Sequence, residues 1–273
     1  MRTVQGGDAA IPALGLGTWA LRGAEARDTV ARALAEGWRH VDTARMYGNE
    51  AEVGDALRAA ATPRAEIFLT TKIWPDDHAP DRLRAAAEDS LRTLGVDHVD
   101  LMLLHWPSKT VPFEETLPAL DALRRDGLAR HVGVSNFTRA QLAKVLEILD
   151  SPLAVNQVEF HPFLDQSKML AALAEAGAAL TAYSPLAKGT VADDPTLRRI
   201  AEAHGTAPGT VALAWILAKG AAAVPKTATP ARLAENLAAA ELALTPEEIA
   251  EIDRLARPDG RMVEPEGVTP DWD

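Results

Sequence analysis

The sequence has no cysteine among its 273 residues and no long hydrophobic run. The first absence excludes disulfides, thiolate zinc sites, iron–sulfur clusters and a cysteine nucleophile. The longest uncharged stretches, residues 176–187 and 205–218, are shorter than the ~18–20 residues that a membrane-spanning helix needs. The first residues also lack the apolar segment of a secretory signal. We therefore expect a cytoplasmic protein with no membrane partner.

Positive charge is scarce as well. The chain carries 28 Lys and Arg against 39 Asp and Glu, and the resulting net charge of −11 argues against nucleic acid as a partner. Apolar residues make up 47% and charged residues 25%, which is typical of a globular protein. Because no linker or low-complexity tract interrupts the sequence, we expect residues 1–273 to form one domain, and we expect a monomer that acts on a small molecule.

Short apolar runs alternate with longer amphipathic stretches along the whole chain. The runs are Leu14–Gly17, Trp38–Asp42, Ile67–Lys72, Val99–His105, His131–Ser135, Val155–Glu159, Ala179–Tyr183 and Ala221–Pro225. Their length is typical of buried parallel strands, and eight of them predict an α/β fold, a (β/α)8 TIM barrel. A doubly wound sheet is the alternative, but it needs a glycine-rich phosphate loop, and Gly15–Ala20 lacks the third glycine of that motif.

The stretches between these runs have helical periodicity. Helices are expected over Ala24–Glu36, Asp81–Leu94 and Arg139–Leu149. Capping boxes are expected at Asn49–Glu52, Thr138–Gln141 and Thr245–Glu248. Outside the barrel repeat we expect a hairpin before Leu14, an extra C-terminal helix over Thr245–Leu255 and a tail over Gly260–Asp273.

Four polar residues stand at the ends of neighbouring predicted strands. Asp42, Lys72 and His105 end the second, third and fourth apolar runs, and Tyr47, one of only two tyrosines, follows Asp42 in the next loop. In an α/β barrel these strand ends share the face that carries the chemistry. Each residue alone also has an ordinary structural explanation. The alternatives are a turn cap for Asp42, a lysine that reaches solvent for Lys72, a core histidine for His105 and a packed ring for Tyr47.

Together the four residues suit one chemical task. We expect the Lys72 ammonium to lower the pKa of the Tyr47 phenol from its usual value of ~10, and Asp42 to hold that ammonium in place. Tyr47 then becomes a general acid, and His105 can donate a hydrogen bond to the same acceptor. Such a site suits protonation of a carbonyl oxygen, but it supplies no hydride, so a cofactor must do so.

Later strand ends carry groups that suit a cofactor. Ser135, Asn136 and Gln157 can match the donors and acceptors of a carboxamide, and the Tyr183 ring can lie flat against a planar ring. Ser135 and Asn136 could instead cap a turn. After the last strand, Lys226 and Arg232 flank a hydroxyl and a predicted helix start, which is a combination that favours phosphate.

These motifs, in this order, resemble the aldo-keto reductase superfamily over about residues 14–236. The segments that carry the resemblance are Gly15–Trp19, Asp42–Glu50, Thr71–Trp74, Leu104–Pro107, Gly133–Phe137, Asn156–Glu159, Tyr183–Leu186 and Lys226–Asn236. The catalytic tetrad of the family falls on Asp42, Tyr47, Lys72 and His105. The ending of the chain, residues 260–273, is similar to the bacterial 2,5-diketo-D-gluconate reductases of the B type.

The resemblance implies an NADPH-dependent reductase of aldehydes and ketones, such as keto-sugar acids and methylglyoxal, without a Rossmann domain. The cofactor positions that it implies are Gly17, Thr18, Trp19, Ser135, Asn136, Gln157, Tyr183, Ser184, Pro185, Leu186, Lys188, Gly189, Lys226, Thr227, Arg232, Glu235 and Asn236. Among them, the resemblance assigns Leu186, Lys188 and Gly189 to a loop over the pyrophosphate, Lys226, Thr227 and Arg232 to the 2′-phosphate, and Glu235 and Asn236 to adenine. The substrate positions are Trp19, Tyr47, Trp74, His105, Trp106 and Trp272. No metal is expected, and His161 is interpreted as structural.

Two other functions remain as alternatives. One is a regulatory binding protein that senses NADPH on the same fold, which a complete catalytic tetrad disfavours. The other is a metal-dependent barrel hydrolase, which needs more His and carboxylate ligands at strand ends than His105 and Asp42 provide. The natural carbonyl substrate does not follow from these motifs.

Overall fold

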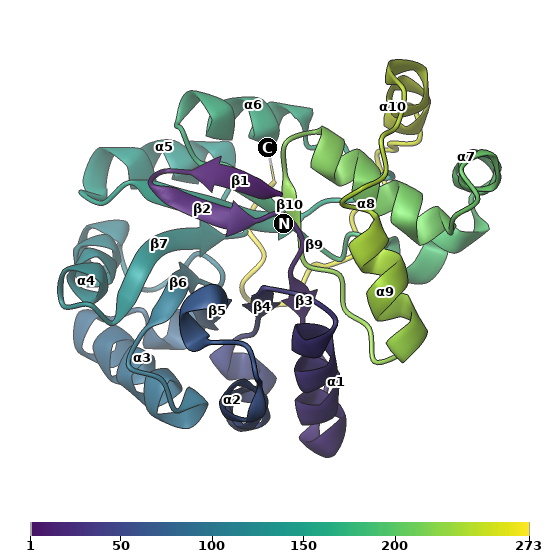
Figure 1. The fold of residues 1–273 in the computed structure, drawn as a ribbon. Coiled ribbons are helices and arrows are strands. Elements are labelled where there is room, and N and C mark those ends of the chain that lie inside the picture. The colour runs from purple at the N-terminus through teal and green to yellow at the C-terminus, as the bar shows by residue number, and fades with distance from the viewer. Residues whose placement is uncertain (1, 273) are drawn as a thin grey trace.

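The computed structural model describes residues 2–272, and its centre is an eight-stranded parallel sheet ringed by helices (Figure 1). The strands are adjacent in chain order: β3 (Leu16–Gly17), β4 (His40–Asp42), β5 (Phe68–Ile73), β6 (Val99–Leu104), β7 (Ala129–Ser135), β8 (Leu153–Glu159), β9 (Ala179–Tyr183) and β10 (Ala222–Ala223). Parallel bridges from Leu14 to Ala223 and from Gly17 to Lys226 bring the last strand beside the first, so the sheet closes on itself. This order agrees with the predicted (β/α)8 barrel.

One helix follows each strand and packs against the outside of the sheet. These helices are α1 (Gly23–Ala35), α2 (Glu50–Ala59), α3 (Pro80–Leu94), α4 (Phe113–Arg125), α5 (Arg139–Ile148), α6 (Ser167–Glu175), α8 (Pro208–Ala218) and α9 (Pro230–Ala238). The extra helix α10 (Pro246–Asp253) lies where the sequence predicted it, whereas α7 (Pro195–Ala203), inserted before α8, was not predicted. Short 3-10 turns occupy η1 (Arg45–Tyr47), η2 (Arg64–Glu66), η3 (Pro75–Asp77) and η4 (Ala187–Asp193).

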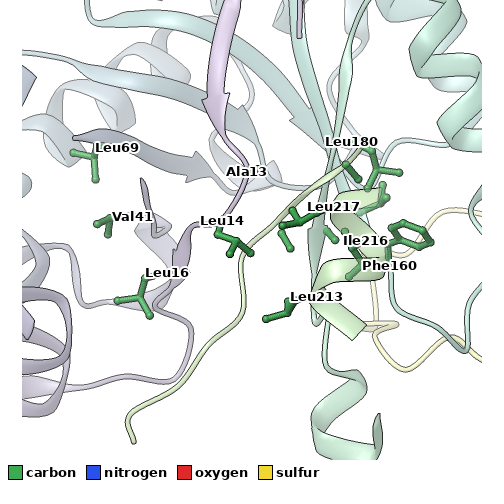
Figure 2. Close-up of a cluster of buried hydrophobic side chains, with 14 of the residues drawn as sticks. Ala13, Leu14, Leu16, Val41, Leu69, Phe160, Leu180, Leu213, Ile216 and Leu217 are labelled. Atoms are coloured by element: carbon green, nitrogen blue, oxygen red, sulfur yellow. The ribbon is translucent and has the colours of Figure 1, made fainter. Parts of the chain in front are cut away.

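The main hydrophobic core lies between the strands and this ring of helices. Leu213, Ile216 and Leu217 of α8 belong to the same buried cluster as Leu14 and Leu180 from the strand side (Figure 2). Nearly every residue of α8 is buried on all sides, which explains its uniformly apolar sequence. Within residues 2–272, no helix is both long and apolar enough to cross a membrane.

The predicted hairpin is confirmed and covers one end of the barrel. Its strands β1 (Thr3–Gly6) and β2 (Ala9–Pro12) are antiparallel, and Ile11 packs against Leu101, Leu103 and Val155. Gly6 lies so close to the barrel that a Cβ there would stand 2.0 Å from the carbonyl oxygen of Ala154. Because the hairpin fills this end, the carboxyl ends of the strands are left to form the site.

Two of the three predicted capping boxes are confirmed and one is wrong. Thr138 with Gln141 and Thr245 with Glu248 make both bonds of the motif. Asn49 does not cap α2, because its side chain bonds elsewhere. Its amide donates to the carbonyl oxygens of Thr18 and Leu21, at 2.8 and 3.1 Å, and its oxygen accepts from Thr43. Asn49 therefore ties the catalytic loop to the loop after β3.

Candidate active site

The four predicted catalytic residues meet at the carboxyl ends of three adjacent strands. Asp42 is the last residue of β4, Lys72 lies near the end of β5, and His105 directly follows β6. Tyr47 is the last residue of η1, the single turn that follows β4. Since β4, β5 and β6 are neighbours in the sheet, the chain needs only these short connections to bring the four side chains together.

Lys72 is the centre of the cluster. Its side chain is fully buried, and the ammonium donates to three oxygens, one for each of its hydrogens. The distances from Nζ are 2.5 Å to Asp42 Oδ1, 2.9 Å to the carbonyl oxygen of Thr43 and 3.4 Å to Tyr47 Oη. These three bonds fix the orientation of the ammonium, and the longest and weakest of them points to the phenol.

Asp42 is held from its other side as well. Its second oxygen, Oδ2, accepts a hydrogen bond of 2.7 Å from Gln157 Nε2 on β8. Thr18 donates its backbone N–H and its hydroxyl to the Asp42 carbonyl oxygen, at 3.0 and 3.1 Å. Asp42 thus links three parts of the site: its carbonyl oxygen binds the loop after β3, and its carboxylate binds Lys72 and a residue from the opposite side of the barrel.

The electrostatics of the phenol differ from the prediction. Burial raises the pKa of Tyr47, the Lys72 ammonium opposes this effect, and the net pKa lies above the usual value for tyrosine. The expected shift toward neutrality is therefore wrong, because desolvation outweighs the ammonium. Burial also acts to lower the pKa of Lys72, but Asp42 and Tyr47 reverse this, so the lysine stays charged. The pair at neutral pH is a protonated phenol beside an ammonium.

His105 lies against the phenol as an uncharged imidazole. Burial, reinforced by Lys72, holds its pKa well below the ordinary value. The ring meets Tyr47 edge to face at 5.6 Å between centroids and Trp74 at 5.2 Å. Within the described part of the chain, His105 Nδ1 has no hydrogen-bond partner. A neutral imidazole has one donor and one acceptor, so it can donate to a substrate oxygen without adding charge.

The predicted carboxamide residues form one network with the catalytic cluster. Ser135 donates to the carbonyl oxygen of Gln157 at 2.7 Å and accepts from Asn136 at 3.0 Å. The Asn136 amide also donates to the carbonyl oxygen of His105, and its oxygen accepts from the Tyr183 hydroxyl at 2.7 Å. Asn136 has a φ of 64°, a left-handed conformation that asparagine tolerates better than most residues. The Tyr183 ring is thus held at one end by its hydroxyl.

The other predicted cofactor residues lie on the segments that follow β9 and β10. Ser184, Pro185, Leu186, Lys188 and Gly189 follow β9, where Ser184, Lys188 and Gly189 all have positive φ. Lys226, Arg232 and Glu235 are exposed on the loop after β10 and on α9, while Thr227 and Asn236 are buried. Gly17 bridges to Lys226, and a Cβ on Gly17 would stand 2.7 Å from the carbonyl oxygen of Val224. This loop therefore lies directly beside the first strand.

The predicted substrate tryptophans differ in their surroundings. Trp19 is 60% exposed at the rim, Trp74 contacts His105, and Trp106 is buried. Trp272 of the tail meets the Trp106 ring at 6.2 Å between centroids, so the tail reaches the catalytic face. Within residues 2–272, no group of three or more His, Asp or Glu side chains is arranged to hold a metal ion.

Two connections of the site were not predicted. The sequence assigned Gln157 to the cofactor, but its contact with Asp42 depends on a distance across the barrel that no local pattern reveals. Glu159 received no role, although it is fully buried and bonds to the tail; a charged residue at the end of a buried strand was the available signal. His161 pairs with Glu159 at 3.2 Å.

Comparison with known proteins identifies the family. The model of the aldo/keto reductase family matches residues 13–257. Methylglyoxal reductase DkgB of Escherichia coli O157:H7 is 39% identical over 267 residues, which cover 97% of this chain and 100% of that protein. Morphine 6-dehydrogenase of Pseudomonas putida is 38% identical over 262 residues, which cover 90% of this chain and 88% of that protein.

Solved structures agree with these relatives. A crystal structure provisionally named 2,5-diketo-D-gluconic acid reductase B matches with a TM-score of 0.98 and 47% identity, over 100% of this chain and 98% of that one. The aldose reductase of Schistosoma japonicum matches with a TM-score of 0.89 and 31% identity, over 95% and 94% of the two chains. The chain therefore belongs to the aldo/keto reductase family.

Proposed function

We propose that this protein is an NADPH-dependent reductase that converts aldehydes and ketones to alcohols, with Tyr47 as the general acid. The observation that carries the proposal is the buried Lys72 ammonium, which donates to Asp42, Thr43 and Tyr47 at once. An arrangement that only stabilised the fold would not need a phenol at the third position. The reductase names of the relatives also support carbonyl reduction.

The residues at the proposed cofactor positions fit a phosphorylated nicotinamide dinucleotide. Lys188, Lys226 and Arg232 are exposed cations suited to its phosphates. Asn236 supports an adenine contact, because its Nδ2 is buried and has no partner within residues 2–272. Tyr183, fixed through Asn136, would stack on the nicotinamide, and Ser135, Asn136 and Gln157 would bind the carboxamide. The bound cofactor would supply the hydride.

The catalytic residues would then transfer one proton to the substrate oxygen. Tyr47 Oη donates its proton to the substrate oxygen as negative charge develops there. The Lys72 ammonium, 3.4 Å from Oη, stabilises the phenolate that remains. Neutral His105 donates a hydrogen bond to the same substrate oxygen and orients the carbonyl. Asp42 acts through Lys72, since it holds the ammonium rather than the substrate, and Gln157 in turn donates to the Asp42 carboxylate.

For the substrate, we propose small dicarbonyl compounds such as methylglyoxal and keto-sugar acids such as 2,5-diketo-D-gluconate. The support comes from the names of similar proteins and from the ending of the chain. Trp19, Trp74, Trp106 and Trp272 would form the walls of the substrate pocket, because Trp74 contacts His105 and Trp272 contacts Trp106.

A carbonyl panel assayed with NADPH and with NADH tests the proposal. We expect oxidation of NADPH with methylglyoxal and with 2,5-diketo-D-gluconate, and slower turnover with NADH. If the protein binds NADPH but no reactive carbonyl speeds its oxidation, the reductase proposal is wrong and a binding protein that senses the cofactor replaces it.

A further inference from the structure

Glu159 anchors the C-terminal tail. Its carboxylate is fully buried at the end of β8, and it accepts the backbone N–H groups of Met262 and Val263 at 2.9 and 3.1 Å. The Arg261 guanidinium lies 3.8 Å from the same carboxylate, and His161 adds a bond of 3.2 Å. A buried carboxylate that receives two N–H groups from one tail segment fixes where that segment lies.

The tail also fits tightly against the loop between β8 and α6. A Cβ at Gly260 would stand 1.9 Å from the carbonyl oxygen of Phe163, and the Arg257 N–H donates to that oxygen at 3.2 Å. Farther along, the Arg261 guanidinium lies over the Trp272 ring at 3.7 Å. In Figure 1 the yellow tail leads from α10 across the middle of the molecule toward α6.

The carbonyl group of Met262 meets the proposed pyrophosphate loop. Lys188 Nζ donates to the Met262 oxygen at 2.7 Å. Met262 therefore receives an ammonium at its oxygen while its N–H is bound by Glu159, so one residue connects the buried carboxylate to the exposed lysine. Lys188 itself lies between Ala187 and Gly189 in three successive left-handed conformations, with φ of 47°, 54° and 97°. Such a backbone persists only where surrounding contacts hold it.

We propose that Glu159 is a positioning residue for cofactor retention, an inference that rests on the proposed function. Glu159 acts through Met262 to hold the Lys188 ammonium in place for the cofactor pyrophosphate. An ammonium has three hydrogens, so Lys188 can keep its bond to Met262 and still donate to phosphate oxygens. An anchored lysine loses less conformational freedom when the phosphates arrive, which strengthens binding. Glu159 touches neither substrate nor cofactor in this account.

A pair of substitutions at Val263 tests the anchor. Val263→Pro removes the N–H that donates to Glu159, whereas Val263→Ala keeps it. We expect Val263→Pro to raise the NADPH Kd about fivefold or more, a common size for coupling between sites. Val263→Ala should stay near wild type. Binding of 2′-AMP, which has no pyrophosphate, should be unchanged in both variants.

Glu159→Gln tests the same anchor from its buried side, and it should weaken NADPH while sparing 2′-AMP. If NADPH binds Val263→Pro as tightly as wild type, or if the Kd values for NADPH and 2′-AMP rise equally, the inference is wrong. A wild-type protein that binds no dinucleotide would overturn the proposed function together with this inference, so the two failures are distinguishable.

A double variant tests whether the tail acts through the lysine. If it does, Lys188→Met combined with Val263→Pro should bind NADPH no more weakly than Lys188→Met alone. Losses that multiply would overturn the route through Lys188. Lys168→Met is the matched control for the loss of a positive charge near the tail. Lys168 lines a cavity of about 140 Å³ beside Arg261 and Trp272, but no described hydrogen bond joins it to Met262, so its loss should leave NADPH binding near wild type.

Discussion

Replacing Lys72 by methionine should cost a large part of the stability as well as the activity. Methionine has a similar length and an apolar end, so it fills the fully buried space but donates no hydrogen bond. Among residues 2–272, the Asp42 carboxylate then keeps only Gln157 as a hydrogen-bond donor, and the Thr43 carbonyl oxygen loses the ammonium. Removing one partner of a buried ion pair costs about 3–5 kcal/mol, so we expect a loss of that size in the free energy of unfolding.

A second substitution separates two causes of the lost stability, the unpaired charge of Asp42 and the changed packing at position 72. In Lys72→Met combined with Asp42→Asn, no unpaired carboxylate remains, so most of the lost stability should return. Reductase turnover should stay low, because Tyr47 still lacks its ammonium. Lys219→Met is a matched control: its exposed pair with Asp253, at 2.6 Å, should contribute less than about 1 kcal/mol.

Urea denaturation followed by circular dichroism measures these differences, provided that unfolding is two-state. A loss below about 1 kcal/mol for Lys72→Met would refute the reasoning, since a buried ion pair that breaks so cheaply is not desolvated as described. A double variant no more stable than the single variant would also contradict it.

Three further predictions concern the cofactor, pH and a helix cap. Lys226→Ala combined with Arg232→Ala should raise the Kd of NADPH much more than that of NADH in fluorescence titrations, and equal losses would move the 2′-phosphate elsewhere. Because burial raises the pKa of Tyr47, the acid form persists at neutral pH and is lost only as pH rises through that raised pKa. The reduction kcat should therefore stay level from about pH 6 to about pH 9, and a fall by half near neutrality would count against Tyr47 as the acid. Thr138→Ala removes one bond of a capping box and should lower the free energy of unfolding by about 0.5–2 kcal/mol, while a value near zero would mean that the cap contributes nothing.

The fold and the catalytic cluster could be predicted because both depend on local patterns. Apolar runs mark the strands, and the carboxyl ends of adjacent parallel strands share one face, so Asp42, Lys72 and His105 had to meet there. The tail anchor could not be predicted, because Glu159 and Met262 are separated by 103 residues and nothing in the intervening sequence signals their contact.

The errors have similar physical causes. Asn49 fits the capping pattern, but tertiary contacts to Thr18, Leu21 and Thr43 take its side chain instead. The direction of the Tyr47 pKa shift was wrong because a sequence names the neighbouring ammonium but does not reveal how deeply the phenol is desolvated. The insertion of α7 lies in a loop, where barrels tolerate extra elements.

The role of Tyr47 as proton donor is the claim on which the account rests most heavily. Single-turnover reduction of methylglyoxal by Tyr47→Phe, with NADPH affinity measured on the same protein, tests it most directly. We predict a loss of about 10²–10⁴-fold in the rate, typical of a missing general acid, with the NADPH Kd essentially unchanged. A rate close to that of wild type would contradict the account, since the substrate oxygen would then take its proton from another group.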